Sequence, residues 1–141
     1  MAKYNHAIQI IGLREIEKNN IIKNFSFERR YNSSYTFHFS LTEISMNYEE
    51  YQLERNFSSY RIRIECSNIE SPKVFIDNPT IWINTPHING DRSLCLFKVT
   101  NFQWFDSNSI AKDIVPLIYM WVYFYEKWQI TGVWLGKEAI H

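Results

Sequence analysis

The sequence predicts an α+β fold with an N-terminal helix, a four-stranded antiparallel meander, a cysteine-bearing loop and C-terminal helices. Three observations lead to this prediction. Runs of alternating polar and apolar residues occur between positions 25 and 76, a turn-rich segment spans 85–96, and apolar residues then recur at three- and four-residue steps. The chain has 141 residues, so we expect a single domain over residues 1–141.

The first helix is expected near the N-terminus. Isoleucines occur at positions 8, 11 and 16, and a further pair follows at 21 and 22. Their uneven spacing only approximates the repeat of one helical face, which is 3.6 residues per turn. The pattern nevertheless favours a helix before the first strand.

Four strands are expected from period-two alternation, over 25–31, 35–41, 60–66 and 73–76. Asn32-Ser33-Ser34 separates the first two runs with residues typical of a turn, which favours a hairpin. In the third run, Tyr60, Ile62, Ile64 and Cys66 share one face. Positions 43–59 are polar with scattered aromatic residues, so this stretch is expected to be a long loop.

The C-terminal third predicts an amphipathic helix that begins after Ser109, a suitable N-cap residue. Pro116 lacks a backbone N–H donor, so the helix should break or kink near Val115. Gly132 can end the helix. Beyond it, Trp134 is expected to fold back on the body of the protein.

Composition excludes several classes of protein. Fifteen basic and fifteen acidic residues cancel, so the chain has no overall field that would attract nucleic acid or an anionic membrane. Apolar residues make up 45% of the chain, which is far more than a disordered segment carries. Neither an apolar signal core nor a window long enough to span a bilayer appears, and we expect a cytoplasmic protein. No metal-ligand spacing or cofactor motif is present, so we expect no cofactor.

The two cysteines have different surroundings. Cys66 continues the apolar face of a strand, where a buried thiol acts as a small hydrophobe. Cys95 follows the turn residues Asn89-Gly90-Asp91 and belongs to no clear alternation, which is the setting of a nucleophilic thiol. His87 is the histidine nearest to Cys95 in sequence and Arg92 is the nearest cation. His38 lies on the polar face of a strand and is expected to be solvated.

The segment Pro86 to Leu96, followed by Trp104, resembles the active-site segment of ubiquitin-conjugating enzymes, with Cys95 at the position of the catalytic cysteine. It is most similar to the prokaryotic members of that family found in bacterial CBASS antiphage operons. The C-terminal part of those members carries residue types that this chain also has. They are Trp121, Tyr123, Tyr125, Glu126, Trp128, Thr131-Gly132, Trp134-Leu135-Gly136, Glu138 and His141. The resemblance implies a UBC fold.

One departure from the family bears on the mechanism. Eukaryotic members carry His-Pro-Asn where this chain has Thr85-Pro86-His87, so His87 stands at the Asn position. Its imidazole can donate to a tetrahedral oxyanion, act as a base toward an amine, or only brace the loop. Asn89 is a second candidate oxyanion donor, although Asn-Gly is also an ordinary turn and the turn is favoured. Asp91 and Asp106 are candidates for attracting an attacking lysine, and Trp104 for packing behind the loop.

The resemblance implies transthiolation, in which Cys95 accepts an acyl group from a protein C-terminus and passes it on. The expected carried protein is a cGAS-like nucleotidyltransferase. No ATP-binding motif appears, so activation of the acyl group is expected to come from a separate activating enzyme or from an unusual chemistry of the partner. Two other classes remain open. The chain can be an inactive UBC-fold binding module for the same partner, or a hydrolase that uses Cys95 with His87.

Overall fold

The computed structural model describes residues 6–30, 34–42, 59–67, 71–96 and 109–134. The elements run in the order α1 (His6–Lys18), β1 (Lys23–Arg29), β2 (Tyr35–Leu41), β3 (Tyr60–Cys66), β4 (Lys73–Asn78), the π-helical turn η2 (Ile110–Ile114) and α2 (Val115–Thr131). The strands form one antiparallel sheet in the order β1-β2-β3-β4. The expected α+β architecture and meander are confirmed. The expected long loop at 43–59 lies outside the described residues, except for Ser59.

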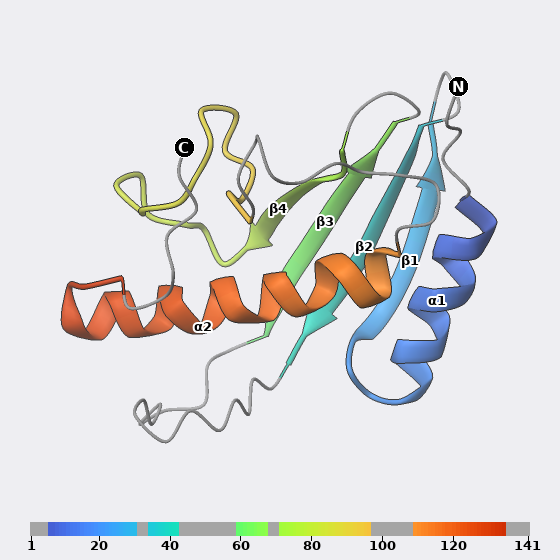
Figure 1. The fold of residues 1–141 in the computed structure, drawn as a ribbon, viewed down its shortest axis with the longest axis horizontal. Coiled ribbons are helices and arrows are strands. Elements are labelled where there is room, and N and C mark those ends of the chain that lie inside the picture. The colour runs from blue at the N-terminus through green and yellow to red at the C-terminus, as the bar shows by residue number, and fades with distance from the viewer. Residues whose placement is uncertain (1–5, 31–33, 43–58, 68–70, 97–108, 135–141) are drawn as a thin grey trace.

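The helix α2 lies across one face of the sheet, and α1 lies beside β1 at its edge (Figure 1). Alternation on β3 buries Tyr60, Ile62, Ile64 and Cys66, as the sequence predicts. These residues belong to the same hydrophobic cluster as Ile118 and Tyr125 of α2. Sheet and helix therefore share one core, in which the apolar face of the sheet and that of the helix cover each other.

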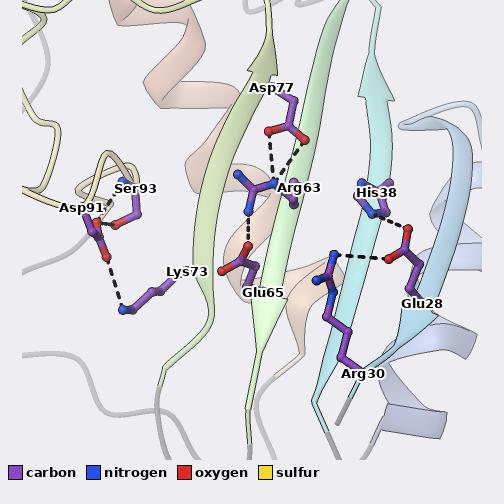
Figure 2. A network of polar contacts seen from close by, with 9 residues as sticks. All are labelled: Glu28, Arg30, His38, Arg63, Glu65, Lys73, Asp77, Asp91 and Ser93. Carbon is purple, nitrogen blue, oxygen red and sulfur yellow. Dashed lines mark hydrogen bonds and ion pairs between the residues drawn. The ribbon is translucent and has the colours of Figure 1, made fainter.

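The opposite face of the sheet carries ion pairs (Figure 2). Arg63 Nε lies 3.0 Å from Asp77 Oδ1, and the guanidinium also stacks over the ring of Phe75. His38 lies on this face as expected but is not solvated, because its side chain is 18% exposed and its Nε2 lies 3.6 Å from Glu28. The expectation of a solvated histidine was therefore wrong. Neighbouring strands cover the imidazole, which a single-strand pattern cannot show.

The helix α1 is confirmed, but its buried face differs from the isoleucine pattern. Ile8 and Ile11 are 52% and 66% exposed, whereas Gln9 and Leu13 are buried. Gln9 Oε1 accepts a hydrogen bond of 2.8 Å from the N–H of Ile110, the first residue of η2. A helix start has backbone N–H groups without helical acceptors, so a buried glutamine serves as the partner that the helix itself does not supply.

The start of the C-terminal helix agrees with the sequence in its details. Ser109 Oγ accepts from the Lys112 N–H at 3.2 Å, and the Asp113 carboxylate accepts from the Ser109 N–H at 2.8 Å. These reciprocal contacts form an N-terminal cap, as predicted for Ser109. The π-helical turn gives way to α2 at Val115, and Pro116 lies in the first turn of α2, so the change of helix type falls where the break was expected.

The middle of α2 is more buried than an amphipathic helix would be. Its six consecutive buried residues are Trp121, Val122, Tyr123, Phe124, Tyr125 and Glu126. Six consecutive residues point in all directions around a helix, so parts of the protein other than the sheet must also pack against α2. The segment 79–96, which follows β4 in Figure 1, supplies part of that cover. In the described part of the chain, no helix has the length and apolar character needed to cross a membrane.

Candidate functional site

The segment that carries Cys95 folds back on itself as a small antiparallel loop. Ile88 and Leu94 form an isolated bridge, and the Asn89 N–H donates to the Ser93 carbonyl at 2.9 Å. At its tip, the Arg92 N–H donates to the Asn89 carbonyl at 2.9 Å, which closes a turn. The Leu94 N–H donates to the carbonyl of Val74 in β4 at 2.8 Å. The loop is thus attached directly to the sheet.

Asp91 braces the turn from within. Its carboxylate accepts from the Ser93 N–H at 2.9 Å and from the Ser93 hydroxyl at 2.5 Å. Lys73 Nζ lies 3.2 Å from the same carboxylate (Figure 2). The hydrogen bonds from Ser93, with a smaller contribution from Lys73, lower the pKa of Asp91. The carboxylate that was a candidate for attracting a lysine acceptor therefore already holds Lys73 of this chain.

Asn89 has the contacts of a loop brace. Its side-chain amide donates to Ser93 Oγ at 3.0 Å and to the Leu94 carbonyl at 3.4 Å. An amide nitrogen has two hydrogens, and these two contacts account for both. The turn that the sequence favoured at Asn89 is the arrangement seen.

Cys95 and His87 come together through the main chain. The Cys95 N–H donates to the His87 carbonyl at 2.9 Å. The Cys95 residue is 8% exposed, and burial raises the pKa of its thiol. His87 is half-buried and adopts a left-handed backbone with φ of +57°, which is uncommon for a residue other than glycine. The two residues that the sequence singled out are therefore joined, with a thiol that is neutral at pH 7.

Two tryptophans that no site prediction included complete this arrangement. The indole N–H of Trp121 donates to the His87 carbonyl at 3.1 Å, so this carbonyl accepts from both Trp121 and Cys95. The Trp134 ring lies 4.8 Å from the His87 imidazole and 5.4 Å from the Trp121 ring, measured between centroids. Trp134 thus folds back on the body as expected. Helical periodicity placed Trp121 in the core, but no local signal directed its N–H toward His87.

The base of the segment is held by a cluster of hydrogen bonds to the Trp82 carbonyl. It accepts from the Thr85 N–H at 3.1 Å and from the Thr85 hydroxyl at 2.6 Å. Arg92 Nη2 donates to the Ile81 carbonyl at 3.2 Å, which links this base to the turn before Cys95. The residues Trp82 and Ile83 are 66% and 85% exposed. An ordered main chain thus carries two apolar side chains at the surface.

Other predicted positions are distant or undescribed. Cys66 is buried in the core, as expected of a structural residue, and within the described residues neither it nor Cys95 forms a disulfide. Trp104 and Asp106 lie outside the described residues. Among the residues that the structure describes, no group of three or more His, Cys, Asp or Glu side chains could hold a metal ion.

Residues 22–141 match the family model described as Type II CBASS E2 protein, which covers the sheet, the Cys95 loop and α2. No curated protein matches the chain.

Proposed function

The chain belongs to the Type II CBASS E2 protein family, and from this membership we propose that Cys95 carries a protein C-terminus as a thioester. Membership in this family indicates an E2-like role in antiphage defence and implies that the chain acts together with other CBASS proteins. We further propose that the carried protein is a cGAS-like nucleotidyltransferase and that transfer takes place in the bacterial cytoplasm. Conjugation would then control the output of that enzyme.

The reaction has two steps. In the first, the Cys95 sulfur bonds to the acyl carbon of an activated C-terminus and the bond from that carbon to its leaving group, AMP or the donor's thiolate, breaks. The thiol proton passes to the leaving group or to solvent. The donor is an acyl-adenylate or a thioester made by a separate activating protein. In the second, an amine attacks the same carbon, the carbon–sulfur bond breaks, the amine loses a proton and the Cys95 thiolate regains one.

The observation that carries the proposal is the pairing of Cys95 with His87. The Cys95 N–H already donates to the His87 carbonyl at 2.9 Å, so it is engaged when an oxyanion would form. The amide of Asn89 is engaged as well. An oxyanion at Cys95 therefore needs another donor, and the neighbouring His87 imidazole has the right chemistry when neutral. In this proposal His87 donates to the oxyanion and Asn89 acts by bracing the loop.

Burial of Cys95 suits a carrier. A thiol with a raised pKa stays protonated at pH 7, so it resists oxidation and random alkylation. The thioester formed on such a thiol is shielded from hydrolysis by the same burial. The cost is a slower first step, since only the thiolate attacks.

The test is co-expression with a cGAS-like nucleotidyltransferase and the separate activating protein that supplies the acyl donor, followed by a non-reducing gel and intact mass measurement. We expect an adduct that is cleaved by added thiol, absent in Cys95→Ala and retained in Cys66→Ala, the matched control for loss of a buried cysteine. His87→Ala should slow its formation by about 10²- to 10³-fold. If His87 donates to the oxyanion, His87→Asn restores most of the rate, whereas a base role predicts no rescue. An adduct that persists in Cys95→Ala would refute the proposal.

The same burial supports a second candidate, a binding module that holds the partner without covalent chemistry. It predicts an equally tight non-covalent complex for wild type and Cys95→Ala, with no thiol-sensitive species in either. The Cys-His hydrolase remains the weaker alternative and predicts cleavage of the partner instead of an adduct.

A further inference from the structure

We propose that Trp134 is a positioning residue that holds the His87 imidazole at the Cys95 site. The inference rests on the proposed function in which His87 assists acyl transfer at Cys95. Trp134 lies 47 positions after His87 in the chain, beyond the end of α2, yet the two ring centroids are 4.8 Å apart with the planes tilted by 42°. This contact brings the segment after the last helix to the candidate site.

The main chain of His87 is held independently of Trp134. Its carbonyl accepts from the Trp121 indole N–H at 3.1 Å and from the Cys95 N–H at 2.9 Å. These contacts determine where the Cα–Cβ bond of His87 begins and points. They do not act on the two side-chain torsions, and a half-buried imidazole ring can adopt more than one rotamer. The Trp134 ring, whose centroid lies 4.8 Å from that of the imidazole, restricts that choice.

Trp134 is itself held rigidly enough to act in this way. Gly132 ends α2 in the left-handed conformation with φ of +76°, and its N–H donates to the Trp128 carbonyl at 2.8 Å, which reverses the chain. The Val133 N–H donates to the Thr131 hydroxyl at 3.1 Å within the same turn. The Trp134 ring then lies 5.4 Å from Trp121, between centroids. The indole is therefore placed by a braced turn and by packing on α2.

Trp121 and Trp134 act on different parts of His87. Trp121 determines the direction of the His87 main chain through a hydrogen bond, and Trp134 selects the rotamer of its side chain through ring contact. A catalytic group displaced by about 1 Å loses up to about 10²-fold in rate. We therefore expect Trp134→Ala to slow adduct formation by about 10- to 100-fold, through His87 and not through Cys95 itself.

A double-mutant cycle tests this. Adduct formation is timed for wild type, Trp134→Ala, His87→Ala and the double variant, with Trp128→Ala as the control for loss of a nearby tryptophan from α2. A positioning role predicts that Trp134→Ala lowers the rate of adduct formation when His87 is present. In the His87→Ala background, the same substitution should have no further effect on the rate. Trp134→Phe should restore most of the rate. An equal loss in both backgrounds would overturn the proposal, because Trp134 would then act without His87.

A second measurement is independent of activity. The His87 ring resonance in a ¹H–¹³C NMR spectrum is assigned by its loss in His87→Asn. Removing the Trp134 ring should move this resonance toward its unperturbed position, whereas Trp128→Ala should leave it unchanged. An unmoved resonance in Trp134→Ala would refute the placement. If wild type forms no adduct while the resonance shifts as expected, the positioning contact stands and the proposed acyl transfer fails.

Discussion

Replacement of Gly132 by alanine should destabilise the protein through backbone strain alone. Gly132 has φ of +76°, and no atom lies within 4 Å of the place where a Cβ would stand. The new methyl group therefore meets no clash. The left-handed conformation costs an L-residue about 1–2 kcal/mol. Alanine also lowers the entropy of the unfolded chain, which returns about 0.4–1 kcal/mol. We expect a net loss of about 1 kcal/mol in the free energy of unfolding.

This loss converts to a change in melting temperature. With an entropy of unfolding of about 2.1 cal/mol/K per residue, a chain of 141 residues gives about 0.3 kcal/mol/K. A loss of about 1 kcal/mol then lowers Tm by about 3 °C. Differential scanning calorimetry measures the shift, and urea titration supplies the free energy.

Gly90→Ala is the matched control. A Cβ at this glycine would also meet no atom within 4 Å, but Gly90 does not have a positive φ, so its replacement should leave Tm unchanged or slightly raised. Gly132→Asn should lose less than Gly132→Ala, because asparagine tolerates the left-handed region better. If Gly132→Ala has the same Tm as the wild type, or if Gly90→Ala lowers Tm by as much as Gly132→Ala, the argument from φ is wrong.

Two further predictions concern Cys95 and Gln9. In a Cys66→Ala background, alkylation of Cys95 by iodoacetamide should rise about tenfold per pH unit and level off only above about pH 8.5, the midpoint of an ordinary thiol, because burial raises its pKa. The stability gained by keeping this thiol neutral is present below the unfolded-state pKa and is lost as pH rises through the folded-state pKa; a plateau near pH 7 would contradict both statements. Gln9→Leu should cost about 1–3 kcal/mol in chemical denaturation, because it leaves the buried Ile110 N–H without the Gln9 acceptor. Ile11→Ala, at an exposed position of the same helix, should stay within about 0.5 kcal/mol, and equal losses at both positions would show that the hydrogen bond is not the cause.

Local chemistry accounts for the parts of the fold that the sequence predicted well. Alternation on β3 identified its buried face residue by residue, and Ser109 and Pro116 located the start of the C-terminal helix. Each of these signals acts within a few neighbours along the chain. The N-terminal helix was predicted from its isoleucines, but its buried face was not. Gln9 lies on that face and accepts a hydrogen bond from the N–H of Ile110, which is 101 positions away in the chain.

The candidate site shows the same division. Turn residues and a family resemblance identified Cys95, His87 and Asn89, and the loop contacts of Asn89 match the turn favoured from the sequence. Neither tryptophan was predicted to contact His87. Their contacts depend on how α2 lies against the segment 79–96, and no periodicity along the chain contains that information.

By itself the sequence determined the strands, the helix start and the presentation of Cys95 on a turn-rich loop, because these follow from side-chain spacing, capping and turn chemistry over short distances. Only the tertiary structure decided the burial of the Cys95 thiol, the double use of the His87 carbonyl and the approach of Trp134. The two tryptophan contacts join residues 34 and 47 positions apart, and such pairs meet only when the hydrophobic core brings their elements together.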